Sequence, residues 1–174
     1  LNLLGDIYIN EELYELAGKA YLRALEKNPE AAPARALRAA KDLAVRGAAR
    51  EAKALAERIE ALHAGKLEAE DQKSLLRLRA RLAAADSATA EEIRILEEIV
   101  SLDPLDGDAL ILLGQHASKS GAPEQAVFYF ERAAAIEAFE ADAKVRHAEL
   151  LVGQSKFAEA LPLLRRAQAL KPRD

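Results

Sequence analysis

The side chains in this sequence that are best suited to chemistry are three histidines, His63, His116 and His147, and several close pairs of carboxylates. None of the histidines lies at an HExxH or comparable spacing from another metal ligand, so no zinc site is expected. The absence of cysteine excludes disulfides, thiolate metal ligands and a thiol nucleophile. No serine lies in a GxSxG setting. We therefore expect no catalytic residue, no metal and no cofactor, and a structural role for His147.

The remaining candidate features also have structural explanations. Glu91 and Glu92 lie at a predicted helix start, where the positive end of the helix dipole stabilises carboxylates. Gly5 and Gly114 each follow a leucine pair, but neither lies in a GxGxxG or GxxxxGKS/T phosphate-binding loop. Close packing between helices is therefore the better explanation of these glycines.

The composition indicates a folded, helical chain. Of the 174 residues, 51% are hydrophobic and 31% are charged, which is typical of folded rather than disordered protein. Alanine, leucine, glutamate, arginine and lysine dominate, and these residues favour helix over strand. The net charge of −4 is spread without a basic face, so nucleic acid is not expected as a partner. No apolar run approaches the ~20 residues that a membrane span requires.

The sequence opens at Leu1 in the middle of a helical pattern and without an initiator methionine, which indicates a fragment. It contains no targeting signal, and a chain without cysteine fits either the bacterial periplasm or the cytoplasm. The localisation is therefore open between these two compartments.

One spacing pattern recurs along the chain. In its first copy Leu4, Gly5 and Tyr8 share one face of a predicted helix, and a turn near Asn10 leads to a second helix. Pro29 is expected to end this second helix. The apolar stripe of the second helix consists of Ala17, Tyr21, Ala24 and Leu25.

The same pattern returns at Gly114, and it recurs at one constant interval, forward at Ala148 and backward at Ala80. It resembles the tetratricopeptide repeat (TPR), a helical hairpin of about 34 residues. The second unit is degenerate, because Ala56 replaces an aromatic residue and no proline closes the unit; Ala32 is an extra residue before it. The predicted units are TPR 1 at 1–31 (truncated at its N-terminus), degenerate TPR 2 at 32–66, an insertion at 67–72, TPR 3 at 73–106, TPR 4 at 107–140 and TPR 5 at 141–174, which ends near Pro172.

This resemblance implies an all-α fold, a right-handed α-solenoid of about five TPR helical hairpins, each stabilised by stacking on its neighbours. Small residues should let the paired helices approach closely, and larger ones should fill the space toward the next hairpin. The small residues are Gly5, Gly114, Ala17, Ala126 and Ala160, and the larger ones are Tyr21, Phe130 and Leu164. Pro162 lies inside a predicted second helix and should bend it.

In TPR proteins the first helices line a concave groove that binds a peptide, so the resemblance implies a partner-binding surface at the corresponding positions. These are Asn2, Asp6, Ile9, Lys41, Val45, Arg77, Arg81, Ile111, Gln115, Lys119, Val145, Arg146 and Glu149, with Asn10, Leu37 and Ser74 beside them. The centre, Lys41, Arg77 and Arg81, is basic and would suit an acidic or C-terminal-carboxylate peptide. A solvated helix face explains these charges equally well.

The two-carboxylate clamp of chaperone-binding TPR proteins is not matched, because Leu112 and Asp142 stand where asparagine and lysine would be needed. The leading hypothesis is a non-catalytic scaffold that binds a protein partner. Alanine-rich TPR arrays also resemble the periplasmic parts of bacterial exopolysaccharide-export and envelope-assembly proteins. A third hypothesis is a docking arm of an enzyme whose catalytic domain lies outside this sequence. Open apolar faces at both ends of the array also predict self-association by end-to-end stacking.

Overall fold

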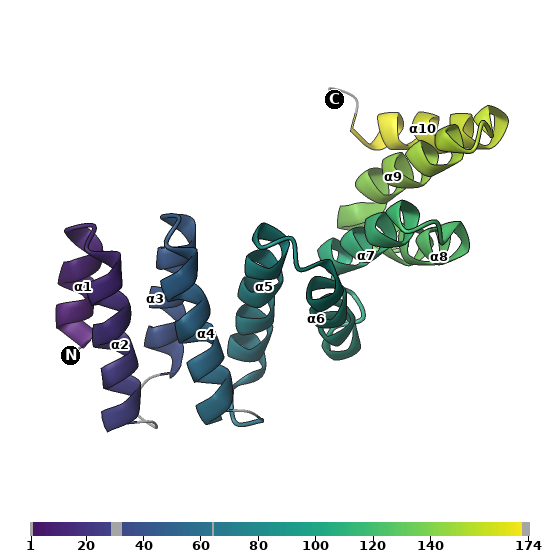
Figure 1. Cartoon of the computed structure of the whole chain (residues 1–174). Coiled ribbons are helices and arrows are strands. Elements are labelled where there is room, and N and C mark those ends of the chain that lie inside the picture. Colours follow the sequence, from purple (N-terminus) through teal and green to yellow (C-terminus); the bar gives the residue numbers. More distant parts are fainter. Residues whose placement is uncertain (1, 29–32, 64, 172–174) are drawn as a thin grey trace. The chain divides into compact units, whose positions relative to one another are not determined.

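A computed structural model describes residues 2–28, 33–63 and 65–171 (Figure 1). Within these ranges the chain forms ten α-helices and one 3₁₀ turn and no strand, which confirms the expected all-α fold. The helices are α1 (Asn2–Asn10), α2 (Tyr14–Lys27), α3 (Pro33–Val45), α4 (Ala49–His63), α5 (Ala69–Ala85), α6 (Thr89–Leu102), α7 (Gly107–Lys119), α8 (Pro123–Ala134), α9 (Glu140–Gly153) and α10 (Phe157–Leu170), with η1 (Glu137–Phe139) before α9. The expectations for Pro29, Ala32 and Pro172 lie outside the described residues. None of the described helices is both long and apolar enough to cross a membrane.

The same three-residue turn joins the helix pairs α1–α2, α3–α4, α5–α6, α7–α8 and α9–α10. The middle residue of each turn has a left-handed backbone, with φ between 57° and 82°. The next residue donates its backbone N–H to the carbonyl five residues back, at 2.8–2.9 Å. This is the Schellman arrangement, which satisfies carbonyls left unpaired at a helix end. The middle residues are Glu12, Gly47, Ser87, Gly121 and Ser155.

The described chain divides into two compact units, and unit 1 spans Leu1–Ile95. Here α1 packs on α2, α3 on α4, and both α3 and α4 on α5. A Cβ atom at Gly5 would overlap the ring of Tyr21, so these helices meet as closely as the sequence predicts. Ala56 is buried where other pairs have a large side chain, and Leu55 beside it fills the core. Residues 69–72, within the predicted insertion, form the first turn of α5, which has 17 residues.

Unit 2 spans Leu96–Asp174, in which α7 packs on α8, α8 on α9, and α9 on α10. Gly114 lies under the ring of Phe130, and Ala126 is fully buried beside them, as predicted. Leu164 behaves differently: it was expected to fill the space toward a next hairpin, but it is 40% exposed, because no described helix follows α10 to cover it. Pro162 does lie inside α10.

Candidate protein-binding surface

The predicted groove residues all lie on the first helix of a pair, on α1, α3 and α5 in unit 1 and on α7 and α9 in unit 2. Each unit therefore has its own part of the predicted surface. Most neighbouring predicted residues within a helix are three or four positions apart, so their side chains project from the same face of that helix.

Asp6 on α1, at the start of unit 1, accepts hydrogen bonds from side chains on two other helices. The Tyr21 hydroxyl donates a hydrogen bond to Asp6 Oδ1, and the Arg35 guanidinium donates to Oδ2. The hydrogen bond from Tyr21, helped by Arg35, holds the pKa of Asp6 below its usual value although burial opposes this. Burial and the bond to Asp6 raise the pKa of Tyr21. This network ties α1 to α2 and α3, so it gives Asp6 a structural role.

Two predicted positions in unit 1 are not on the surface. Ile9 is 5% exposed and Leu37 is 2% exposed, and both belong to the core of the unit. Their assignment to a binding groove is wrong, because these side chains pack between helices and are shielded from solvent. Asn2 and Asn10 remain accessible at the two ends of α1.

The predicted basic centre is on the surface of unit 1. Lys41 on α3 and Arg77 and Arg81 on α5 are exposed, and α3 packs directly against α5. Within the described ranges Lys41 and Arg81 form no ion pair. Val45 lies one turn after Lys41 and is 72% exposed. We call Lys41, Val45, Arg77 and Arg81 the basic face of unit 1; it combines cations with an exposed apolar side chain.

In unit 2 four of the predicted residues line a hollow of about 720 Å³, here called the α7–α9 hollow. Gln115 and Lys119 come from α7, and Arg146 and Glu149 come from α9. Arg146 Nη1 lies 2.9 Å from Glu149 Oε2, in an ion pair between two half-exposed side chains. The further lining residues are Ser118, Gly121, Pro123, Phe130, Leu150, Gly153 and Gln154. Ile111, also predicted for the groove, is half-buried on α7 and does not line this hollow.

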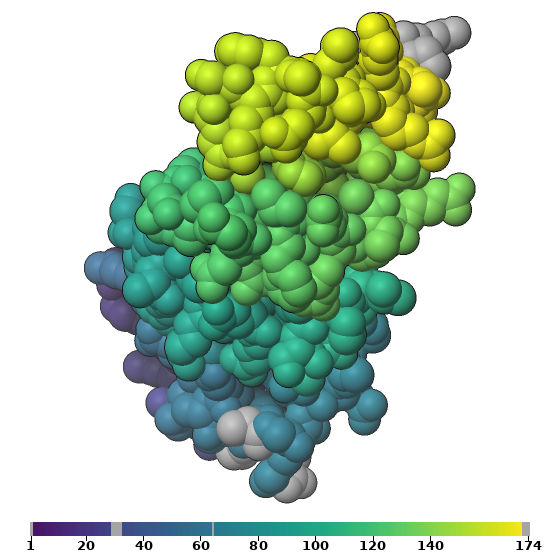
Figure 2. Space-filling view, turned by 90° about the vertical axis from the view of Figure 1, so that its right-hand side faces the viewer, coloured from purple at the N-terminus to yellow at the C-terminus, as the bar shows by residue number. Residues whose placement is uncertain are grey.

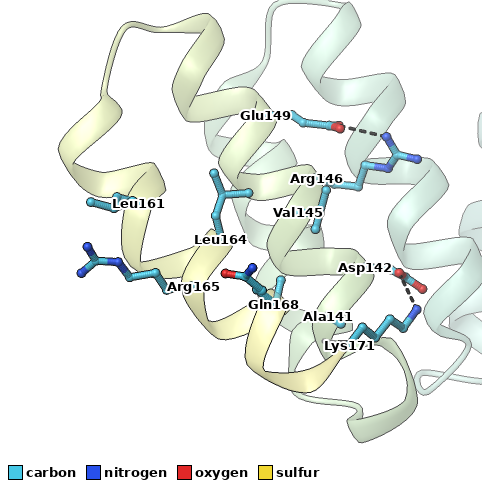
Figure 3. Close-up of a pocket in the computed structure, with 11 residues that line it drawn as sticks. Ala141, Asp142, Val145, Arg146, Glu149, Leu161, Leu164, Arg165, Gln168 and Lys171 are labelled. Atoms are coloured by element: carbon cyan, nitrogen blue, oxygen red, sulfur yellow. Dashed lines mark hydrogen bonds and ion pairs between the residues drawn. The ribbon is translucent and has the colours of Figure 1, made fainter. Parts of the chain in front are cut away.

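A second hollow of about 670 Å³ lies between α9 and α10 and is called the α9–α10 hollow (Figure 3). It shares Arg146 and Glu149 with the α7–α9 hollow and includes the predicted Val145. Figure 2 shows the side chains of α9 and α10 in light green and yellow. The sequence analysis did not predict the wall of the α9–α10 hollow that α10 forms, which consists of Leu161, Leu164, Arg165, Ala167 and Gln168. The lining also includes Ala141 and Asp142 of α9 and Lys171, directly after α10.

Two of the histidines, His147 and His63, lie in packed parts of the described structure. His147 stacks on Phe130, with ring centroids 6.4 Å apart and an interplanar angle of 28°, and burial lowers the pKa of His147. The structural role expected for His147 is therefore observed. His63 is buried at the end of α4. Among the described residues no group of three or more His, Cys, Asp or Glu side chains could hold a metal ion.

Residues 1–30 match the sequence profile of the tetratricopeptide repeat, and α1 and α2 within that range form the expected helix pair. The N-terminal helix pair is therefore similar in sequence to a single tetratricopeptide repeat. No curated protein sequence matches the chain.

Several solved TPR structures share the fold. MamA superposes with a TM-score of 0.74 at 18% identity, over 98% of this chain and 95% of that chain. YrrB, described as a TPR protein with an unusual peptide-binding site, gives 0.71 at 19% identity, over 97% of this chain and 84% of that chain. MamA from Desulfovibrio magneticus RS-1 gives 0.71 at 15% identity, over 97% and 91%. At these identities the likeness establishes the TPR solenoid fold and nothing about ligands.

Proposed function

We propose that this TPR chain is a non-catalytic scaffold that binds a protein segment along the exposed face of its first helices. The observation that carries the proposal is the α7–α9 hollow, because the predicted Gln115, Lys119, Arg146 and Glu149 meet in one surface depression. TPR folds generally serve as protein-interaction scaffolds, and the fold relative YrrB is described as having a peptide-binding site.

The chemistry of the α7–α9 hollow suits an extended segment with a carboxylate. The side-chain amides of Gln115 and Gln154 can donate hydrogen bonds to a peptide backbone and accept hydrogen bonds from it, and Phe130 and Leu150 contribute apolar lining to the hollow. The ion pair between Arg146 and Glu149 is half exposed, so it contributes little to stability. A ligand carboxylate can therefore replace Glu149 beside Arg146 at small energetic cost.

The basic face of unit 1 favours an acidic segment as well. Lys41 and Arg81 are exposed cations without an ion pair to another described residue, so a ligand carboxylate would have no internal competitor. Arginine can bind a carboxylate through two parallel hydrogen bonds, which adds direction to the attraction. The exposed Val45 offers an apolar contact beside these cations.

The proposal is tested by selecting displayed random peptides on the 174-residue chain and then measuring their affinity for charge-reversal variants. Lys119→Glu with Arg146→Glu should abolish binding of peptides held by the α7–α9 hollow. Lys41→Glu with Arg81→Glu does the same for peptides held by the basic face. Arg23→Glu with Lys27→Glu is the matched control, because it makes the same change in charge on the exposed surface of α2.

The proposal requires that at least one of the first two variants loses binding while the control retains it. Selected peptides that bind all three variants equally well would exclude both surfaces. Capture of partners by the full-length protein then separates a plain scaffold from the two other hypotheses. A signal peptide in the full-length sequence would support an exopolysaccharide-export component, and a catalytic domain would support an enzyme docking arm.

A further inference from the structure

A hollow of about 520 Å³, here called the turn hollow, lies between the α1–α2 turn and the α3–α4 turn, at one end of unit 1 (Figure 1). It shares no residue with the basic face or with the two hollows of unit 2. One wall comes from the α1–α2 turn and the start of α2, and the other comes from the α3–α4 turn and the start of α4. The lining residues are Glu12, Leu13, Tyr14, Glu15, Leu16, Arg46, Gly47, Ala48 and Glu51.

Two exposed leucines line the turn hollow at places that are small or polar in the other helix pairs. Leu13 is 47% exposed and Leu16 is 43% exposed. Counted from the middle residue of each turn, the other pairs carry a glutamate or glutamine at the place of Leu16, namely Glu51, Glu91, Gln125 and Glu159. At the place of Leu13 they carry Ala48, Ala88, Ala122 and Lys156. The two leucines therefore form a small apolar site that the repeat pattern does not require.

Glu51 is the most buried of the carboxylates that line the turn hollow, with 15% of its side chain exposed. The absence of a side chain at Gly18 makes room for it, because a Cβ at Gly18 would lie 3.1 Å from Cγ and 3.2 Å from Cβ of Glu51. At the place of Gly18 the other second helices carry Lys53, Ile93, Val127 and Leu161. Arg50 Nη2 lies 2.9 Å from Glu51 Oε1, but the Arg50 side chain is 79% exposed. A ligand cation can therefore take the place of Arg50 beside Glu51.

The other charges that line the turn hollow are acidic on balance. Glu12 and Glu15 line it together with Glu51, whereas Arg46 is the one cation among its lining residues. Glu12 forms no ion pair with another described residue. Glu15 pairs with Lys19 at 2.6 Å, but both side chains are more than half exposed, so this pair contributes little to stability. Cationic side chains of a partner would therefore meet carboxylates that are weakly held by the chain itself.

We propose that the turn hollow binds a basic, amphipathic protein segment. Apolar side chains of the segment cover Leu13 and Leu16. Its lysine or arginine side chains pair with Glu12, Glu15 and Glu51. This charge preference is opposite to that of the basic face, so the two surfaces select different segments. The proposal is independent of the proposed function, because it shares no residue with either surface assigned there.

The experiment selects displayed random peptides on the 174-residue chain, after removal of those that also bind the variant Glu12→Lys with Glu15→Lys. The remaining peptides should be rich in lysine, arginine and large apolar residues, and that variant should weaken their affinity at least about tenfold. Glu97→Lys with Glu98→Lys is the matched control, because it makes the same change in charge on the exposed surface of α6 and should leave affinity unchanged. A selection that leaves no peptides, or acidic ones, would overturn the proposal, and so would an equal loss of affinity in the control.

A leucine variant tests the apolar site. Leu13→Ala with Leu16→Gln gives the first helix pair the residues that the α7–α8 pair carries at these places, so the fold should persist while affinity falls at least about tenfold. Leu105→Ala with Val152→Gln is its control, because both side chains are exposed outside the turn hollow. Unchanged affinity in the leucine variant would leave only a nonspecific attraction between charges and would overturn the proposal.

Two single variants test the buried carboxylate in opposite directions. Arg50→Gln removes the ion-pair partner of Glu51 and should strengthen binding, because the ligand cation then has no competitor from Arg50. Glu51→Gln keeps the shape of the side chain beside Gly18 and should weaken binding. Weaker binding in Arg50→Gln, or unchanged binding in Glu51→Gln, would contradict the role of Glu51 and overturn the proposal.

Discussion

A methyl group added at Gly114 would collide with the ring of Phe130, so Gly114→Ala directly probes the contact between α7 and α8. The new Cβ would lie 2.5 Å from Phe130 Cε1 and 2.7 Å from Cδ1, whereas ordinary contacts begin at 3.4 Å. The ring would have to move by about 1 Å. It has little room, because His147 stacks on it and Ala117 and Ala126 pack beside it.

Two opposing effects determine how Gly114→Ala changes the free energy of unfolding. Overpacking a well-filled core typically destabilises a protein by ~1–3 kcal/mol. Replacing glycine by alanine within a helix stabilises it by up to ~1 kcal/mol. Gly153→Ala, at the end of α9, isolates the second effect, because a Cβ there would meet nothing within 4 Å. We therefore expect Gly114→Ala to be less stable than Gly153→Ala by ~1–3 kcal/mol, the cost of the collision with Phe130.

The assay is urea unfolding followed by circular dichroism, with the midpoints compared at a common slope. Phe130→Leu makes room for the added methyl group, so the double variant Gly114→Ala, Phe130→Leu should be more stable than the sum of the single changes predicts. Equal midpoints for Gly114→Ala and Gly153→Ala, or strict additivity in the double variant, would refute the tight contact between Gly114 and the ring.

Three further outcomes are expected. Ala126→Leu should overpack the same contact and destabilise the chain by ~1–3 kcal/mol, and an unchanged melting temperature would contradict the packing assigned to Ala126. Ser155 has a left-handed backbone with a φ of 61°, which glycine adopts more easily, so Ser155→Gly should increase the free energy of unfolding by roughly 1 kcal/mol and raise the melting temperature. Gly121 has a φ of 76°, so Gly121→Ala should decrease the free energy of unfolding by a similar amount and lower the melting temperature. Because the folded pKa of Asp6 lies below 3.8, its contribution to stability is complete above that pH and is lost as pH falls through the folded pKa. Acid unfolding should therefore show the difference between wild type and Asp6→Asn shrinking below pH 3.8; a constant difference would exclude this role.

The groove assignment shows the limit of carrying positions over from a repeat pattern. The positions carried over from the TPR resemblance include Lys41, Val45 and Arg81, which are exposed in the structure. They also include Ile9 and Leu37, yet both are buried. Spacing along the sequence indicates which residues share a face of one helix. How much of that face is buried depends on the helices that pack against it.

The turns show a similar division. Gly47 and Gly121 are visible in the sequence as residues suited to a left-handed turn. Glu12, Ser87 and Ser155 adopt the same conformation without that signal. Their backbone is imposed by the Schellman hydrogen bonds and by the packing of the two helices on either side of each turn.

The sequence by itself determined the helical composition, the recurring hairpin pattern and the small residues at which paired helices meet, because these depend on local propensity and on spacing along one helix. Only the tertiary structure decided that Leu164 is exposed while Phe130 is covered, and that Arg146 and Glu149 stand between two hollows. Those facts depend on which helix packs beside which, and burial is a property of that arrangement rather than of any single segment.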